Sequence, residues 1–432
     1  MTPDIDRRKL LTTVGAATAL GIAGCLGDDD DDDDDDDGVD DTDDMDDGDD
    51  DPAPDLEAFD LGLLMGVTGG LEELGPPIRE SSEAAVTQIN DADVGFDVNT
   101  LFEDTATDPD DGVLGAEALR DAGVPMFVGA LASDVSLPVA ESVSIPNQVV
   151  QMSPASTAPA YTDLEGDWTF RTAASDAIQG VIVANLARDE GADTAAWIGR
   201  DDPYGRGLGG VFAESFEDLG GEITAEIPID PAEDRFVSQL EDALADDPDV
   251  LFVVAFTEEA TPLFSDFFGN FDPAEYTVIV PDGLRSEALP GDVGEDFSDF
   301  LGTQPTSDPD LESGVDAFSE IVDNPDGAFV RQAYDAAAVL CLARAAAGED
   351  NSEAIRDQIR EVANPGGETV TAENLPEGME MAAAGEEVEY LGVSGPIEFD
   401  ENGDVVDAAI EVWSWTPEGE IETISVETVD LG

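Results

Sequence analysis

The pattern of apolar and polar positions between residues 59 and 300 alternates between two periods. Apolar runs predict strands over 59–67, 96–102, 124–129, 148–152, 195–199, 222–229, 250–255 and 276–280. Amphipathic stretches between them predict helices over 78–90, 109–121, 136–143, 177–190, 207–219, 235–245 and 259–268. Strands that alternate with helices of this length are typical of βαβ units. We therefore expect an α/β fold with parallel sheets.

The pattern changes after residue 300. It predicts helices over 309–322, 329–347 and 352–362, and then strands over 395–399 and 407–416. The joint 400–404, Asp-Glu-Asn-Gly-Asp, looks like a fragment of a calcium loop. It lacks the full spacing and the closing Glu, so we interpret it as an Asn-Gly turn. The body of about 375 residues exceeds one typical hydrophobic core, which predicts two domains.

The N-terminal segment carries the features of an export leader. Arg7-Arg8 followed by Lys-Leu-Leu is a Tat-type signal. The apolar stretch 10–23 is too short and too weakly apolar to predict a transmembrane helix. Ile-Ala-Gly-Cys25 resembles a lipobox, so we predict residues 1–25 to be a signal with Cys25 as the lipidation site. An ordinary cleaved leader with an incidental cysteine is the alternative.

Aspartates dominate the segment after Cys25. Ten in succession occupy 28–37. Repulsion between like charges predicts a disordered, extended tether over 26–57. A calcium-binding role is the weaker interpretation, because a calcium site needs fixed geometry as well as charge. We expect the protein to lie on the extracellular face of the cell membrane, lipid-anchored after Tat export.

The charge of the chain is extreme and is not confined to the tether. There are 104 Asp+Glu against 15 Lys+Arg, a net charge of −89, of which residues 52–432 carry −71. Such self-repulsion is tolerable where salt shortens the Debye length to about 3 Å, near 1 M. The near absence of lysine resembles proteins of extreme halophiles, although a basic partner would also suit an acidic surface. Nucleic-acid binding is excluded, because phosphate contacts need clustered Lys and Arg.

Several catalytic and cofactor sites are excluded by residue type. Without histidine there is no Ser-His-Asp triad and no His-Cys zinc site, and the only lysine lies in the leader, so there is no P-loop. Residues 205–210 satisfy G-x-G-x-x-G, but they do not directly follow a strand as a dinucleotide fingerprint does. We predict no cofactor, no metal site and no enzyme activity. Cys341, in a helix of small residues, is expected to be buried.

Polar residues follow the predicted strands, where open α/β sheets bind ligands. Ser133 lies between the strand 124–129 and the helix predicted at 136, so it would sit near a helix N-terminus, which suits a carboxylate. Ser156 and Thr157 follow the strand 148–152. Each of these residues could instead cap a helix or a turn.

Eight segments in order resemble the branched-chain amino-acid (Leu/Ile/Val) binding family of ABC transporters. They are 66–90, 102–109, 127–141, 149–162, 170–180, 201–208, 280–283 and 393–404. The resemblance implies a type I periplasmic-binding-protein fold, with two Rossmann-like lobes and a three-crossover hinge. It assigns 58–172 and 303–405 to one lobe, and 173–302 and 406–432 to the other.

The resemblance also implies a ligand site. Ser133, Ala155 and Thr157 would hold the α-carboxylate and part of the amine, with Ser156 beside them. Asp282 would bind the α-ammonium, although many members have the longer Glu there. Tyr204 lies in the matching loop of the second lobe. Phe256 and Leu74 would form the side-chain pocket, and Leu74 replaces a residue that is often aromatic.

We therefore expect an extracytoplasmic solute-binding component of an ABC importer, with an amino acid or similar zwitterion as ligand and permease subunits as partners. A membrane-tethered ligand-sensing domain of the same fold and a binder of amides or urea are the alternatives. An exported hydrolase is the third, but it would have to work with carboxylates alone.

Overall fold

The computed structural model describes residues 58–92, 94–307 and 314–430. The chain separates into two units, residues 1–51 and 52–432, and the described residues all belong to the second. The predicted signal, Cys25 and the aspartate tether lie outside the described residues. No helix among the described residues is both long enough and apolar enough to cross a membrane.

The first sheet is parallel throughout. Its strands are β1 Phe59–Met65, β2 Val98–Asp104, β3 Met126–Gly129, β4 Val150–Ser153 and β5 Thr169–Arg171, in the order β2-β1-β3-β4-β5. The helices in this part are α1 Gly75–Asp91, α2 Pro109–Asp121, α3 Ser133–Val139 and α4 Ile145–Asn147, with a π-helical stretch, Ala140–Ser144, between the last two. The central strands β1, β3 and β4 are almost entirely buried, which explains their continuous apolar sequences.

The second sheet is mixed. Its order is β15-β14-β10-β9-β8-β6-β7. The strands are β6 Thr194–Arg200, β7 Glu222–Ile229, β8 Val250–Val254, β9 Thr277–Val280, β10 Leu301–Thr306, β14 Asp407–Trp415 and β15 Ile421–Asp430. The first five are parallel, whereas β14 pairs antiparallel with β10 and β15. Its helices are α5 Asp176–Asp189, α6 Pro203–Asp218, α7 Val237–Ala243, α8 Thr257–Asn270 and α9 Leu289–Val293.

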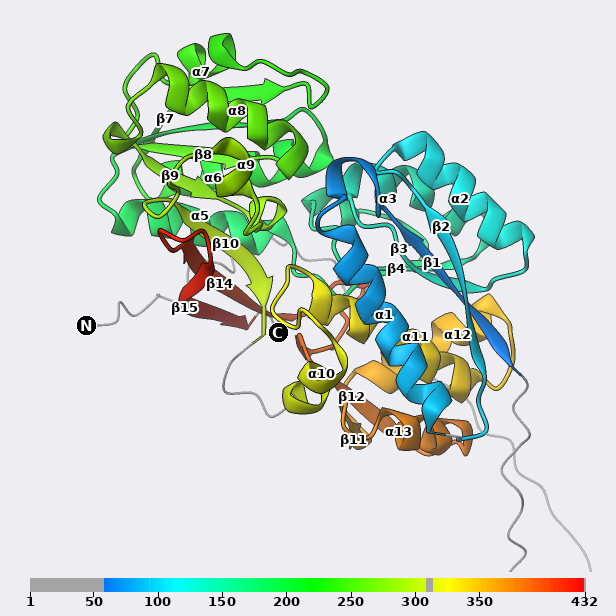
Figure 1. Cartoon of the computed structure of the whole chain (residues 1–432). Coiled ribbons are helices and arrows are strands. Elements are labelled where there is room, and N and C mark those ends of the chain that lie inside the picture. The colour runs from blue at the N-terminus through cyan, green and yellow to red at the C-terminus, as the bar shows by residue number, and fades with distance from the viewer. Residues whose placement is uncertain (1–57, 93, 308–313, 431–432) are drawn as a thin grey trace, which may run out of the picture. The chain divides into compact units, whose positions relative to one another are not determined.

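The chain returns to the first sheet between β10 and β14. This segment holds α10 Val315–Ile321, α11 Val330–Ala347, α12 Ser352–Ala363 and α13 Leu375–Ala383, with a small sheet of β11 Glu368–Val370, β12 Val388–Gly392 and β13 Gly395–Pro396. Helix α11 packs along α1 and contacts β3 and β4 (Figure 1). It is buried over nearly its whole length, and Cys341 is fully buried within it, as the sequence predicted.

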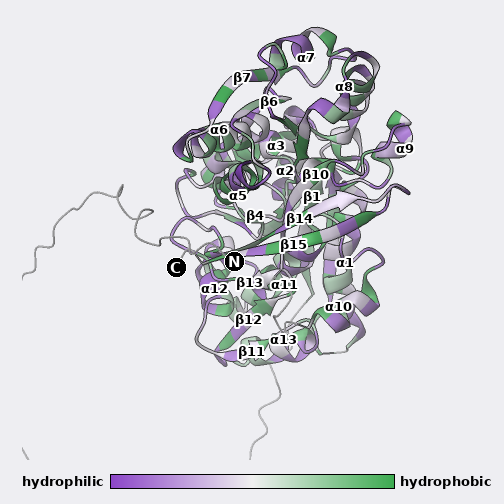
Figure 2. Ribbon diagram, turned by 90° about the vertical axis from the view of Figure 1, so that its left-hand side faces the viewer, coloured by the Kyte–Doolittle hydropathy of each residue, from purple (hydrophilic) through white to green (hydrophobic). Residues whose placement is uncertain are grey.

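The helices of the second sheet are amphipathic. Figure 2 shows hydrophilic and hydrophobic residues mixed along α6, α7 and α8. Four phenylalanines of α6 and α8, Phe212, Phe216, Phe264 and Phe267, are fully buried. The prediction of an α/β fold with parallel sheets is therefore confirmed, and packing of helix faces against strands accounts for the pattern that carried it.

Some predicted boundaries were wrong. The strand predicted over 395–399 shrinks to Gly395–Pro396 plus an isolated bridge between Phe399 and Val405, since Pro396 lacks the N–H that a longer ladder needs. Strand β10 was missed because Gly302 and Pro305 disfavour strands. It forms because β9 and β14 pair with both of its edges, and Gly302 is required where a Cβ would lie 2.1 Å from the Trp413 ring.

Two predicted helices also start elsewhere. Helix α3 begins at Ser133 rather than at residue 136, and α6 begins at Pro203 rather than at 207, since Asp202 caps it by accepting a hydrogen bond from Gly205 N. Of the helix predicted over 309–322, the structure describes Val315–Ile321, and residues 309–313 lie outside the described part.

Candidate functional site

The candidate site lies where strands of both sheets end. Ser133 starts α3 after β3, Ala155 follows β4, Tyr204 follows β6, Phe256 follows β8 and Asp282 follows β9. In parallel sheets the carboxyl ends of neighbouring strands meet at one edge, and loops there are free to carry ligand-binding groups. Segments far apart in the sequence therefore meet around one cavity.

Six of the eight predicted residues line this cavity, which has a volume of about 20 Å³. They are Leu74, Ser133, Ala155, Tyr204, Phe256 and Asp282. The remaining lining residues are Leu71, Ile78, Leu131, Ala132, Gly283 and Phe329. A cavity of this size holds about one water molecule, so in this conformation the site is nearly closed.

Ser156 and Thr157 lie behind the cavity wall rather than in it. Ser156 is fully buried, and its hydroxyl oxygen lies within hydrogen-bond distance of Leu131 O at 3.0 Å and of Ser136 Oγ at 2.5 Å, which ties the loop after β4 to the start of α3. The Thr157 hydroxyl donates to Asp176 Oδ2 at 2.9 Å. Both residues therefore shape the loop that carries Ala155.

Two buried carboxyl groups dominate the electrostatics of the site. Asp282 Oδ1 accepts from Gln179 Nε2 at 2.8 Å and its Oδ2 from the Tyr204 hydroxyl at 3.3 Å. Burial raises the pKa of Asp282 to about 6. Burial and the Asp282 charge raise the pKa of Asp176 well above its ordinary value.

Asp176 and Gln179 each keep one polar atom without a partner among the described residues. These atoms are Asp176 Oδ1 and Gln179 Oε1, and both are buried. A buried polar oxygen without a hydrogen-bond partner is costly. The pair of carboxyl groups therefore provides a place where a bound cationic N–H donor would be strongly stabilised.

The other side of the cavity is apolar. Leu71, Ile78 and Leu131 are buried there, Leu74 is half-buried, and the rings of Phe256 and Phe329 are buried as well. Phe256 stacks on Tyr204 with ring centroids 5.5 Å apart. The site therefore joins an acidic end to an aliphatic and aromatic wall, an arrangement common in small-molecule sites.

Ser133 supplies the third chemical feature. It is the first residue of α3, and the residue before it, Ala132, has no side chain that could cap the helix. The free N–H groups at a helix start favour a negative ligand group. The Ser133 hydroxyl accepts a hydrogen bond from Ala158 N at 3.2 Å, which leaves its proton free to donate.

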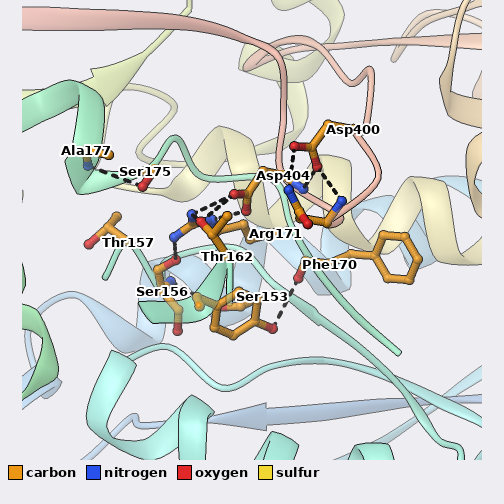
Figure 3. A network of polar contacts seen from close by, with 12 residues as sticks. Ser153, Ser156, Thr157, Thr162, Phe170, Arg171, Ser175, Ala177, Asp400 and Asp404 are labelled. Atoms are coloured by element: carbon orange, nitrogen blue, oxygen red, sulfur yellow. Dashed lines mark hydrogen bonds and ion pairs between the residues drawn. The ribbon is translucent and has the colours of Figure 1, made fainter. Parts of the chain in front are cut away.

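A buried arginine holds the loop after β4 in place. Arg171, at the end of β5, donates from Nε to Asp404 Oδ1 at 2.5 Å and from Nη2 to Asp404 Oδ2 at 3.0 Å (Figure 3). Its Nη1 donates to Ser156 O at 3.3 Å and to Ala158 O at 3.0 Å, and Nη2 also donates to Thr162 Oγ1 at 2.8 Å. One guanidinium thus fixes the backbone on both sides of Thr157 and joins it to the turn at residues 400–404.

That turn is stabilised by its own side chains. Asp400 Oδ1 accepts from the backbone N–H groups of Asn402 and Asp404, as in an Asx turn. Among the described residues, no group of three or more Cys, Asp or Glu side chains is arranged to hold a metal ion.

A second, larger cavity of about 860 Å³ lies beside β10, β14 and β15. It is lined by Arg285, Gln304, Arg331 and Glu411 among others, and none of the eight predicted residues lines it. Arg285 lies 3.5 Å from Glu411 and Arg331 2.8 Å from Asp326, so each of these cations already has a carboxylate partner. The small cavity, which is lined by six of the eight predicted residues, is the better candidate.

Asp176 and Gln179 were missed by reasoning from the sequence. Asp176 follows Ser175, which caps α5, and an aspartate at that position is ordinary for the first turn of a helix. In a chain with 104 acidic residues one more aspartate carries no signal. The spacing Asp-x-x-Gln places both side chains on one face of α5, but only the tertiary contacts with Thr157 and Asp282 reveal that face.

Comparisons with known proteins show what this chain is similar to. A family model described as "Periplasmic binding protein" matches residues 59–416. A "Leu/Ile/Val-binding protein homolog 1" of Brucella melitensis is 27% identical over 308 residues, which cover 70% of this chain and 82% of the relative. A "Chemotactic signal transduction system substrate-binding protein BasB" of Halobacterium salinarum is 24% identical and covers 70% of this chain and 73% of the relative.

Solved structures share the fold. A leucine binding protein, LivK, of Thermotoga maritima superposes with a TM-score of 0.71 at 23% identity, covering 85% of this chain and 98% of that one. A solute binding protein of an ABC transporter from R. palustris, in complex with 4-hydroxybenzoate, has a TM-score of 0.71 at 16% identity. The match covers 87% of this chain and 98% of that one.

Proposed function

The chain belongs to the periplasmic binding protein family, and on this premise we propose that it is the solute-binding component of an ABC importer. We propose further that its ligand is an α-amino acid with an aliphatic side chain. Relatives named for binding Leu, Ile and Val support this assignment. The observation that carries it is the buried Asp282, which lines the cavity beside an apolar wall and whose charge acts on the buried Asp176.

The acidic pair selects for an ammonium group. Two carboxyl groups share a buried space, and Asp176 Oδ1 has no donor among the described residues. A ligand ammonium would supply the missing donors and neutralise the Asp282 charge, which burial otherwise disfavours. A benzoate-type acid, such as the ligand of the R. palustris protein, brings a negative charge and no ammonium. It would leave the pair uncompensated.

The other ligand groups have partners of matching chemistry. The α-carboxylate would lie at the start of α3 beside Ser133, with Ala155 in the adjacent loop. The side chain would lie against Leu71, Leu74 and Phe256. Burying an aliphatic side chain of this kind contributes roughly 1.5–3 kcal/mol.

Binding has to include opening and closing of the site. A cavity of about 20 Å³ with buried lining residues admits no amino acid in its present conformation. We propose that residues 58–172 with 303–405, and 173–302 with 406–432, form two lobes that move about the crossovers near 172, 303 and 405. Closure would exclude water, and charged contacts strengthen in a drier site.

We also propose the location. The twin-arginine leader supports Tat export, Cys25 supports lipid attachment, and the aspartate segment 26–57 supports a tether on the extracellular face. The charge of −71 on residues 52–432 supports a protein adapted to high salt. Mass spectrometry of protein extracted from the native membrane tests the anchor. An unmodified Cys25, or a chain that begins elsewhere, would contradict it.

Thermal unfolding tests the ligand class. The full chain would be unfolded in multi-molar KCl with each amino acid, with urea, with short amides and with 4-hydroxybenzoate. A ligand at a hundredfold excess over Kd stabilises the folded protein by about 2.7 kcal/mol. We expect stabilisation by leucine, isoleucine or valine. Stabilisation by amides or urea alone would refute the ammonium site, and stabilisation by 4-hydroxybenzoate alone would refute the amino-acid assignment.

A sensing role is the second candidate, because the similar Halobacterium salinarum protein is named for chemotactic signal transduction. Deletion of the gene separates the two roles. Loss of uptake of the radiolabelled amino acid supports transport. Loss of the swimming response to that amino acid with normal uptake supports sensing.

A further inference from the structure

Arg200 lies behind the candidate site and contacts residues of the parts built on both sheets. It is the last residue of β6 and is almost completely buried. Its Nε lies 2.5 Å from Asp202 Oδ2 and its Nη1 2.7 Å from Glu259 Oε1, both within the part built on the second sheet. Its Nη2 lies 3.8 Å from Asp134 Oδ2, and Asp134 belongs to α3, in the part built on the first sheet. Among the described arginines, it has the most carboxylate partners.

The same guanidinium also positions the aromatic wall. Its central carbon lies 4.1 Å from the centroid of the Phe256 ring, a cation–π distance. Glu259 Oε1, which pairs with Arg200, also accepts a hydrogen bond from Phe256 N at 2.8 Å. Arg200 thus contacts the Phe256 ring, and its partner Glu259 binds the Phe256 backbone.

Asp134 connects this cluster to the opposite wall. It follows Ser133 directly, and its side chain is only 18% exposed. Burial and the nearby Asp202 charge raise its pKa to about 6, while Arg200 acts in the opposite direction. The charged groups that face it are Arg200 and Asp202, with Glu259 behind the guanidinium. Without Arg200, Asp134 would meet only negative charge across the site.

We propose that Arg200 is a positioning residue that favours the closed form of the site by holding Asp134 of α3 and Phe256 of the second sheet together. The inference rests on the proposed ligand-binding function but assigns no ligand contact to Arg200. The same contact would hold the walls together around a bound ligand in an enlarged cavity, so its effect acts through the populations of open and closed forms. When a ligand binds one form only, the apparent Kd is the intrinsic Kd divided by the fraction of that form.

The proposal predicts that the effects of substituting Asp134 and Arg200 on leucine binding are not additive. If Arg200 acted only within the part built on the second sheet, the two effects would be independent. Asp134→Asn removes the charge across the site and leaves Arg200 paired with Asp202 and Glu259. We expect the Kd for leucine to rise about fivefold to tenfold, mainly because leucine dissociates faster. Arg200→Met should weaken binding at least as much. The double variant should be no weaker than Arg200→Met alone, because one contact cannot be lost twice.

The matched control removes an ion pair of the same length elsewhere. Arg235 Nη2 lies 3.8 Å from Asp266 Oδ1, within the part built on the second sheet and away from the candidate cavity. Arg235→Met should leave the Kd and the dissociation rate for leucine unchanged.

A measurement without ligand separates this proposal from the assignment of the ligand. Nitroxide labels would be placed at Leu114→Cys on α2 and Leu219→Cys after α6, both exposed, in the full chain with Cys25→Ser. Electron–electron distance measurements on the ligand-free protein give the populations of open and closed forms. We expect Asp134→Asn to shift them toward longer distances.

Each outcome has one meaning. Shifted distances with no binding of any amino acid to the unaltered protein would overturn the proposed ligand but keep the role of Arg200. Unchanged distances together with unchanged leucine affinity in Asp134→Asn would overturn the role of Arg200 and keep the ligand. Additive losses in the double variant would also overturn it, because they would show that the two residues act independently.

Discussion

Replacing Asp282 by asparagine should stabilise the ligand-free protein and weaken amino-acid binding. The substitution keeps the size of the side chain and a possible bond to Gln179 or Tyr204, but it removes the charge. Asp282 is almost completely buried, and its pKa is raised by that burial to about 6, from an ordinary value of 3.8. The folded protein therefore binds this proton more tightly than the unfolded chain does.

The sign and size of the effect follow from this difference. Stability falls as the pH rises from about 4 to about 6, and the whole loss is present above pH 6. At 1.36 kcal/mol for each pH unit, the carboxylate costs the folded protein ~3 kcal/mol at pH 7.5. Asparagine carries no such cost. An unfolding entropy of ~0.8 kcal/mol/K for a body of this length converts the gain into a rise of about 4 °C in Tm.

Ligand binding should change in the opposite direction. Removing one partner of a buried charge pair costs about 2–5 kcal/mol of binding free energy, which is roughly thirtyfold or more in Kd. Calorimetric unfolding without ligand and titration calorimetry with leucine, both in multi-molar KCl at pH 7.5, measure the two effects. Asp292→Asn, at an exposed position on α9, is the control. A lower Tm for ligand-free Asp282→Asn, or a Kd for leucine within twofold of the unaltered protein, would refute the reasoning.

Four further predictions address pH, pocket size, the buried arginine and salt. Leucine affinity should fall as the pH drops below about 6, because protonation of Asp282 removes the charge that attracts the ammonium. Titration calorimetry from pH 5 to 8 measures this, and an affinity that does not change with pH would contradict it. Leu74→Trp should weaken leucine binding about tenfold more than alanine binding, since the larger ring takes up room in a cavity of about 20 Å³; equal losses for both ligands would count against Leu74 as part of the side-chain wall. Arg171→Met should destabilise the folded protein by about 3–5 kcal/mol, because it leaves Asp404 and two carbonyl groups without their donor; a Tm within 1 °C or so of Arg235→Met would show that the network contributes little. Tm should rise with KCl from roughly 0.1 to 1 M as screening shortens the Debye length from about 10 to 3 Å; a Tm independent of salt would oppose the halophilic interpretation.

The sequence predicts much of this architecture because periodicity and strand ends are local signals. Ser133 was expected at the site because it follows a strand, and Tyr204 and Asp282 because their segments resemble a known family; the structure brings all three around one cavity. Their distance apart in the chain did not matter, since parallel strands bring their carboxyl ends together.

Other features depend on tertiary contacts that leave no local signal. Strand β10 contains Gly302 and Pro305 and forms only because both neighbours pair with it. Asp176 has the sequence context of any first-turn aspartate, and its importance lies in Thr157 and Asp282, which are distant in the chain. The roles of Ser156 and Thr157 behind the wall follow from hydrogen bonds that only a folded chain defines.

Every arginine that the structure describes lies within ion-pair distance of at least one carboxylate. Since the chain has 104 acidic residues against 15 basic ones, most carboxylates remain without a basic partner. Two copies that approach each other in dilute salt should therefore repel, and light scattering should give a positive second virial coefficient that decreases as KCl rises. A protein that docks on this one therefore has to supply the basic side chains of the interface.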